Sequence, residues 1–408
     1  MTTELQRLID GLGQRLKRNV TVDDSRLRQL AFSSHEYGPV DQLREQSILK
    51  REVPSGAAKW TFASGAKTAV GPFRPPLAPE IGATAQRLCV PIRQEGTLLG
   101  FVWILEGDDP IDDSELQTVL AVIDTIAVVM QRDQLANELH RSRARELVRD
   151  LVMPDEASTR EHAAAELVDS DLFVGSEPAV AIVVSLHPDQ RALLDTERDV
   201  LGGWLERISG RLSDRRHISL VRRDHGLLLL SDKDPLISGD AKVKLTEELL
   251  DNLDRDLRGA EPFAGVGGVV ANLTDLYRSY RQAERAAHVA RVVGGLGRVA
   301  LSDRLGVYGL LMRIPQDELT LDALPAGLLQ LLESGAKGEQ LAATLETFLD
   351  LAGDSQATAE KLFIHRTTLY YRLQRIEELT GAQMARGEDR LAFHLGLKIA
   401  RLVGLRRD

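Results

Sequence analysis

The chain has 408 residues, 43% of them apolar, and a formal net charge of −10 at pH 7. A soluble chain of this length forms about two or three domains that bury their own cores. Its single cysteine, Cys89, excludes an intramolecular disulfide and a multi-cysteine zinc site. Apolar runs stay shorter than the ~18 residues of a membrane span. We expect a cytoplasmic protein without membrane contact, whose acidic surface as a whole does not favour nonspecific nucleic-acid binding.

Residues 1–133 predict a mixed domain of helices and strands. An amphipathic helix opens the chain, and strands are expected at VTVDD and LRQLAFSS. A Pro/Gly-rich loop follows, and then the hairpin RLCVPIRQEGTLLGFVWILEG, with Gly96 between its two β-rich runs. Trp60, Phe62 and Trp103 either line a small-molecule cavity or belong to the ordinary core, and the sequence leaves both alternatives open.

A long helix is predicted next, because residues 114–153 contain neither Gly nor Pro. Asp112, Asp113 and Ser114 offer N-caps for it. Its first half is apolar and its second half is charged. That pattern indicates a helix that packs on a sheet and then continues as a connecting rod, which pairs with a second copy. We assign residues 134–170 to the connecting helix and linker.

Residues 171–304 alternate between strand and helix patterns, which predicts an α/β sandwich with helices over a sheet. Strands are expected at AVAIVVSLH and FAGVGGVVAN and a hairpin at HISLVRRDHGLLLLSD, with helices between and after them. The glycines at 265–268 lie inside a strand-like run and do not open a helix. Close backbone packing is therefore favoured over a dinucleotide-binding loop.

Residues 305–408 carry almost no strand signal and predict an all-α domain. Helices are expected at LDALPAGLLQLLE, GEQLAATLETFLDLA, SQATAEKL, RTTLYYRLQRIEEL and DRLAFHLGLKIARLVG. Apolar residues at 358–373 have the spacing of a helix-turn-helix, namely Ala359, Leu362, Ile364, Leu369 and Leu373. Ser355 is the expected N-cap of the first helix. Phe363 stands in the turn, where many such motifs have glycine.

The second helix of this motif separates into two faces at ~100° per residue. Leu369, Leu373 and Ile376 form the buried stripe. Because the first turns of a recognition helix enter the major groove, the residues predicted to contact bases or the groove are Arg366, Thr367, Thr368, Tyr370 and Tyr371. Phosphate contacts are predicted for Arg372 and Arg375, and for Lys361 from the first helix. Residues 361–408 hold ten Lys and Arg against five Asp and Glu, a balance of +5.

The run TAEKLFIHRTTLYYRLQRIEELTG, followed by DRLAFHLGLKIARL, resembles the C-terminal helix-turn-helix of PucR/CdaR-type transcriptional regulators. The residues that match the family pattern are His365, Arg366, Thr368, Leu369, Tyr371, Arg372, Leu373 and Gly381. Thr367 stands where the family usually has asparagine, and Tyr370 stands where it often has arginine. These two differences imply a different operator preference. His365 is included among the predicted DNA-binding residues. Upstream, FAGVGGVVANLTDLYRSYRQAERAAHVA resembles the end of the family's GGDEF-like domain, and residues 1–133 resemble a GAF-type sensor.

The resemblance implies a multidomain α+β protein. Its parts are a GAF-like α/β sensor (1–133), a long connecting helix (134–170), a degenerate GGDEF-like α/β sandwich (171–304) and an all-α domain (305–408) with the helix-turn-helix at about 355–381. The implied partners are a double-stranded DNA operator, a small-molecule effector at the GAF-like domain, and a second or further copy of the chain. The implied protein uses no cofactor.

A nucleotide cyclase is the sharpest enzymatic alternative. A working GGDEF hairpin needs a glycine pair for close approach of the nucleotide and acidic residues that hold Mg²⁺. The run VRRDHGLLLL has Asp224 and Gly226 but neither the glycine pair nor an acidic dyad, so Asp224 and His225 are expected to be turn residues and the chain is predicted not to be an enzyme. A signalling scaffold that uses its helical tail for protein contact remains the alternative to DNA binding.

Overall fold

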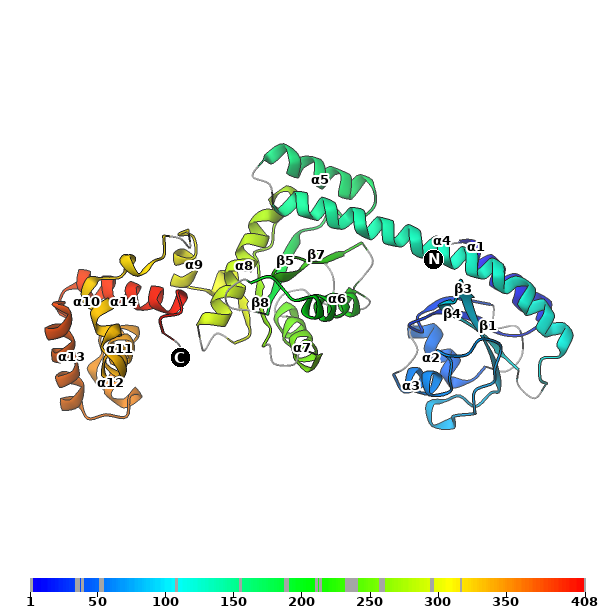
Figure 1. Ribbon diagram of the computed structural model, residues 1–408, viewed down its shortest axis with the longest axis horizontal. Helices are drawn as coiled ribbons and strands as arrows, with labels where there is room; N and C mark the ends of the chain where they lie inside the picture. Colours follow the sequence, from blue (N-terminus) through cyan, green and yellow to red (C-terminus); the bar gives the residue numbers. More distant parts are fainter. Residues whose placement is uncertain are drawn as a thin grey trace. The chain divides into compact units, whose positions relative to one another are not determined.

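The computed structural model describes residues 3–33, 37, 40–50, 55–106, 109–153, 156–186, 191–209, 212, 215–231, 241–256, 261–293, 297–315 and 318–406. The chain divides into two compact units, residues 1–140 and 141–408, and each is described by itself (Figure 1). Within the described ranges, none of the helices has the length and apolarity needed to cross a membrane.

The first unit is built on an antiparallel sheet of four strands in the order β2-β1-β4-β3. The strands are β1 (Val20–Asp24), β2 (Gln29–Phe32), β3 (Arg87–Gln94) and β4 (Thr97–Leu105). Glu95 and Gly96 connect β3 to β4, and both have positive φ, +48° and +82°. Two such residues suit the tight turn of a two-residue hairpin. The predicted hairpin and the strand at VTVDD are confirmed.

Helices cover both faces of this sheet. One face packs on α1 (Thr3–Leu16) and on the first part of α4 (Asp113–Val152), through residues such as Ile9, Ile126 and Val22. The other face packs on α2 (Gln42–Lys50) and α3 (Ser55–Ala63), which the sequence analysis did not predict. Cys89 lies fully buried on this second face, beside Phe101 and Trp103. A short 3-10 helix covers Pro79–Ile81.

The long helix α4 is continuous over 40 residues, which confirms the predicted helix. Its residues from Val119 to Met130 belong to the core of the first unit. Its last two turns, from Leu147 to Val152, belong to the core of the second unit, where they pack with α5 (Ala157–Asp169).

The second unit contains a five-stranded sheet in the order β6-β7-β5-β8-β9, antiparallel except for the β8–β9 pair. Its strands are β5 (Ala179–Ser185), β6 (His217–Val221), β7 (His225–Ser231), β8 (Phe263–Val266) and β9 (Val299–Leu301). The end of α4, α5 and α8 (Leu276–Val292) cover one face, while α6 (Asp195–Ser209) and α7 (Ala241–Asp256) cover the other. The predicted α/β sandwich is confirmed, although β9 and α5 were not anticipated.

Two glycines let α8 lie directly against β8. A Cβ atom on Gly265 would come within 2.0 Å of the Ala283 carbonyl oxygen, and one on Gly267 within 2.1 Å of the Ser279 carbonyl oxygen. Side-chain carbons essentially never approach oxygen this closely, so only glycine fits at either position. The prediction of close backbone packing is confirmed, and the two glycines serve the core of the domain.

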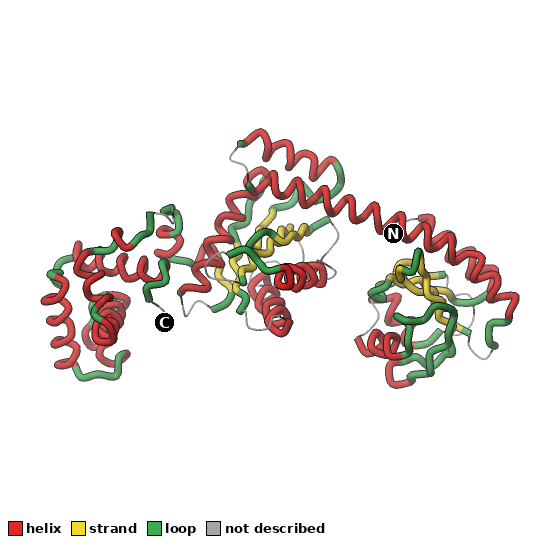
Figure 2. The backbone as a smooth tube through the Cα atoms, in the orientation of Figure 1, coloured by secondary structure: helices red, strands yellow, loops and turns green. Residues whose placement is uncertain are grey.

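The rest of the second unit is helical, as Figure 2 shows for the described residues after β9. Its helices are α9 (Val307–Leu311), α10 (Ala326–Glu333), α11 (Gly335–Asp350), α12 (Ser355–Lys361), α13 (Arg366–Thr380) and α14 (Gly387–Leu402). Short 3-10 helices cover Leu273–Asp275, Ser302–Arg304 and Leu321–Ala323. Helices α10 to α14 share one core that includes Leu328, Leu345 and Leu369.

Candidate nucleic-acid interface

Helices α12 and α13 form a helix-turn-helix whose first helix is capped by an aspartate. The Asp354 carboxylate accepts hydrogen bonds from the backbone N–H groups of Gln356 (2.8 Å) and Ala357 (3.1 Å). The predicted cap, Ser355, is wrong by one position, because Ser355 is the first residue of the helix. Both residue types cap well, and the loop geometry places Asp354 at the cap. Ala359 is buried in the shared core, as predicted.

The turn between the helices is a Schellman motif with phenylalanine in the position that usually holds glycine. The N–H of Phe363 donates to the Glu360 carbonyl (3.1 Å) and the N–H of Ile364 donates to the Ala359 carbonyl (3.0 Å). These are the two hydrogen bonds of the motif, in which the residue just after the helix cap, here Phe363, takes the left-handed conformation. Phe363 has φ of +54° and is 95% exposed. An L side chain there costs about 1 kcal/mol relative to glycine.

Helix α13 has the two faces that the sequence predicts. Leu369, Leu373 and Ile376 are buried against α10, α11 and α12. The opposite face is exposed to solvent, with Tyr370 at 57% and Tyr371 at 70% of their maximal exposure. Two neighbouring exposed tyrosines form an apolar surface that favours a binding role. Arg366, Thr367 and Thr368 are exposed at the N-terminal end of the same helix.

His365 is the N-cap of α13. Its Nδ1 accepts from the backbone N–H of Thr367 at 3.4 Å and lies 2.9 Å from the Thr367 hydroxyl oxygen. Arg366 reaches back to the first helix, where its Nη2 donates to the Gln356 side-chain oxygen at 2.7 Å. The guanidinium is thus oriented by one hydrogen bond and has further donors in its fork. No motif in the sequence singles out Gln356.

The three cations predicted to contact phosphate differ in their surroundings. Lys361 is exposed at the end of α12. Arg375 is half-exposed and pairs with Glu378 at 2.9 Å. Arg372 is partly buried, and its Nη1 donates to the Thr344 hydroxyl of α11 at 3.1 Å. One nitrogen of Arg372 therefore attaches α13 to α11 of its own domain.

Three other cations of this region hold the helical domain together. Lys398, Arg401 and Arg406 converge on the buried carboxylate of Glu346, with N–O distances of 3.1, 2.8 and 2.7 Å. Burial alone would raise the pKa of Glu346, but these cations outweigh it and lower the pKa from 4.5 to about 2. Lys398 also donates to Asp350 at 2.8 Å.

The balance of +5 counted from residues 361–408 therefore overstates the positive charge that faces outward. Glu346 and Asp350, which neutralise part of it, precede the counted segment. Arg407 and Asp408, which the count includes, lie outside the described residues. The cations left near the exposed face of α13 are chiefly Lys361, Arg366 and Arg375.

The β6–β7 hairpin carries a polar network in the second unit. The His225 ring lies between Asp224 (Nδ1–Oδ1 2.8 Å) and Tyr280 (Nε2–OH 3.1 Å), and the Tyr280 hydroxyl donates to Glu284 at 2.5 Å. Burial raises the pKa of Tyr280, and His225 lowers the pKa of Asp224. His225 is the buried first residue of β7, so its predicted place in the turn is wrong. The network fastens the hairpin to α8.

Comparison with known families covers both parts of the second unit. Residues 341–399 match the PucR C-terminal helix-turn-helix domain, and residues 174–289 match the GGDEF-like domain. The chain is a PucR/CdaR-type transcriptional regulator. The match at 341–399 contains α12, α13 and most of α11 and α14, so the exposed face of α13 belongs to a DNA-binding motif.

Three curated relatives align with this regulator over most of its length and of their own. It is 23% identical to the proline-responsive transcriptional activator PutR of Bacillus subtilis, over 97% of this chain and 96% of the relative. It is 20% identical to the DNA-binding transcriptional activator AdeR of the same organism, over 97% of this chain and 92% of AdeR. It is 24% identical to the carbohydrate diacid regulator of Escherichia coli, over 79% of this chain and 82% of that regulator.

Proposed function

We propose that α13 reads the operator through Arg366, Thr367, Thr368, Tyr370 and Tyr371. The observation that carries this proposal is the division of α13 into a fully packed face and an exposed face with arginine, threonine and tyrosine side chains at its N-terminal half. Lys361, Arg372 and Arg375 would contact phosphates from either side, while His365 caps the helix and fixes its first turn. Phosphate contacts position a recognition helix and base contacts give it specificity.

The first unit would be the sensor of this regulator. Its four-stranded sheet between α1 and α4 on one face and α2 and α3 on the other suits the GAF-like domain proposed for residues 1–133. A relative over nearly the whole chain is named for its response to proline, which supports a small-molecule response here as well. The GGDEF-like domain, proposed for residues 171–304, would transmit the signal without catalysis, because the run VRRDHG has neither a glycine pair nor an acidic dyad.

A homodimer would form along α4. Val128, Leu135 and Leu139 are apolar side chains of this helix that are each more than half exposed. Spacings of seven and four residues place them on one stripe, as in a helix that pairs with a second helix. Effector binding would then alter the pairing of this connecting helix and with it the spacing of the two helix-turn-helix motifs. Because half-sites must match that spacing, operator affinity would change.

Salt titration of DNA binding by the full chain tests the interface proposal. Counterion release makes log K fall linearly with log salt, and each lost phosphate contact reduces the slope by about 1. We expect Lys361→Gln and Arg375→Gln each to reduce the slope in this way, and Arg7→Gln, on α1 of the first unit, to leave it unchanged. Equal slopes for all four proteins, or binding that salt does not weaken, would favour a protein-docking scaffold instead.

A further inference from the structure

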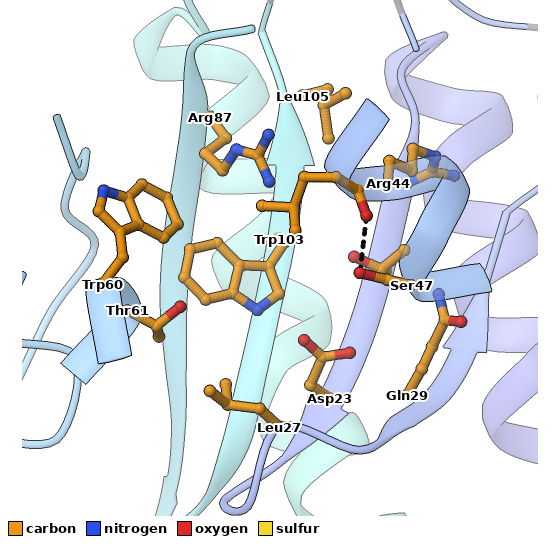
Figure 3. A pocket seen from close by; sticks show the side chains of 12 residues that line it. Asp23, Leu27, Gln29, Arg44, Ser47, Trp60, Thr61, Arg87, Trp103 and Leu105 are labelled. Carbon is orange, nitrogen blue, oxygen red and sulfur yellow. Dashed lines mark hydrogen bonds between the residues drawn. The ribbon is translucent and has the colours of Figure 1, made fainter. Parts of the chain in front are cut away.

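The first unit contains a cavity on the sheet face that α2 and α3 cover (Figure 3). Its walls come from β1, β2, β3, β4, α2 and α3, and they combine Trp60, Trp103 and leucines with three buried charged side chains, Asp23, Arg44 and Arg87. The cavity volume is ≈ 40 Å³. A ligand of this site would therefore be small.

Arg44 is a buried cation with unused hydrogen-bond donors. It is 3% exposed, and its Nη2 makes one long contact, 3.3 Å, to the Ser33 carbonyl. Its Nε and Nη1 have no hydrogen-bond partner among the described residues. Buried polar groups are normally paired, and each unmade bond is costly. Oxygen atoms of an anionic ligand would supply the missing acceptors.

The neighbouring carboxylate, Asp41, is already engaged by other donors. It accepts hydrogen bonds from the backbone N–H groups of Arg44 (3.0 Å) and Ala85 (3.3 Å), and it forms a buried ion pair with Arg87. Arg87 is thereby held by a protein acid. Arg44 is hydrogen-bonded to the same acid only through its backbone N–H. The charges of Asp41 and Asp23 act on its guanidinium, but its Nε and Nη1 donors are left for a ligand.

Asp23 supplies the opposite chemistry in the same cavity. Its side chain lies next to the Trp103 indole (Figure 3), and within the described part of the chain no cationic side chain is hydrogen-bonded to it. Burial, together with the neighbouring Asp24, raises the pKa of Asp23 to about 7, although Trp103, Arg44 and Arg87 act in the opposite direction. A positively charged hydrogen-bond donor stabilises the ionised form of a buried carboxylate whose pKa is raised.

We infer that this cavity binds a small amino carboxylate of the α-amino-acid class, with the carboxylate on the free donors of Arg44 and the ammonium group on Asp23. A simple anion would satisfy Arg44 but repel Asp23, and a simple amine would leave Arg44 unpaired. A zwitterion satisfies both without adding net charge to a buried site. Leu27, Leu43 and the ring of Trp60 line the rest of this small cavity, so the ligand would be one of the smallest amino acids. This inference rests on the proposed sensor role of the first unit.

Calorimetric titration of the full chain with the twenty common amino acids tests the ligand class. We expect at least one to bind, and its analogues that lack either the amine or the carboxylate to bind at least about 10-fold more weakly, as expected for losing a charged hydrogen-bond partner. Dicarboxylates, nucleosides and sugars form the comparison set. A member of that set that binds in the cavity when no amino acid does would refute the ligand class and leave the sensor role standing. Absence of binding by every compound would refute both.

Two substitutions separate this site from a merely structural cluster. Arg44→Met should abolish amino-acid binding and at the same time raise the midpoint of thermal unfolding of the ligand-free protein, because it removes buried unpaired donors. Asp23→Asn should weaken binding of the amino acid at least about 10-fold. It should leave binding of the 2-hydroxy analogue unchanged, because a hydroxyl group needs no carboxylate partner. Arg7→Met, on the opposite side of the sheet, is the control and should change neither property. Unchanged affinity in Asp23→Asn would overturn the inference even if Arg44→Met failed to fold.

Discussion

Replacing Glu346 with Gln should destabilise the helical domain that presents α13. In the folded protein the pKa of Glu346 falls from 4.5 to about 2 because Arg401, Lys398 and Arg406 outweigh the effect of burial. At 1.36 kcal/mol per pKa unit, this lowering of the Glu346 pKa corresponds to about 3 kcal/mol of folding stability. Removing one partner of a buried charge cluster costs a similar amount, about 3–5 kcal/mol, because the remaining charges stay buried. The pKa and the cost of a broken charge cluster both indicate that Glu346→Gln lowers the free energy of unfolding by about 3 kcal/mol.

Hydrogen exchange followed by mass spectrometry on the full chain measures this loss locally. Peptides from α11 and α14, which carry Glu346 and its cationic partners, should exchange faster by about 100-fold, the equivalent of about 3 kcal/mol. Peptides from α1 and β4 should not change. Glu339→Gln, on the exposed side of α11, is the matched control. Its local stability should stay within about 0.5 kcal/mol of that of the parent protein. Equal protection in Glu346→Gln and in this control would refute the assigned role of the cluster.

The same cluster predicts a pH dependence. A carboxyl whose folded pKa is depressed stabilises the fold above its unfolded pKa and loses that contribution as pH falls through the folded pKa. For Glu346 the contribution is complete above about pH 5 and disappears towards pH 2. Urea unfolding should therefore show a stability gap between the parent protein and Glu346→Gln that is largest at neutral pH and shrinks below pH 4. A gap that is constant with pH would contradict the electrostatic explanation.

Three further substitutions test other parts of the account. Phe363→Gly should stabilise the helical domain by about 1 kcal/mol in urea unfolding, since it removes the left-handed side chain, and a loss of stability would show that Phe363 makes a contact we have not recognised. Gly327→Ala should destabilise it by about 1–3 kcal/mol, because the new Cβ would lie 2.3 Å from the Thr380 carbonyl oxygen and this overlap outweighs the ~1 kcal/mol gain in helix propensity. The double variant Leu135→Glu/Leu139→Glu should shift the chain to monomer in sedimentation, whereas an unchanged mass would place the dimer contact elsewhere.

The sequence predicted best the parts of the fold that local patterns determine. The hairpin β3–β4 has two β-rich runs around a two-residue turn, and α4 has no helix-breaking residue over its length. In α13 the spacing of Leu369, Leu373 and Ile376 alone identified the buried face. These features depend on residues close together in the chain, so periodicity and turn chemistry are sufficient to find them.

Features that depend on distant residues were missed for physical reasons. Helices α2 and α3 are short and weakly amphipathic, and tertiary packing rather than periodicity stabilises them. The partners of Arg401 and Arg372, which are Glu346 and Thr344, lie on α11 and are distant in sequence. The same is true of the cavity, where β1, α2 and β3 bring together charged residues that no motif connects. Trp60 and Trp103, for which the sequence left core and cavity open, serve both roles.

Selection of genomic DNA fragments by the full-length protein shows whether α13 reads a DNA sequence. We expect the parent protein to enrich a defined sequence with two half-sites. The Arg366→Ala/Thr367→Ala variant should lose that enrichment, because its substitutions lie on the exposed face of α13 and should leave the packing of the helix intact. Absence of any enriched sequence, or identical enrichment by the variant, would contradict the assignment of α13 as the helix that reads DNA.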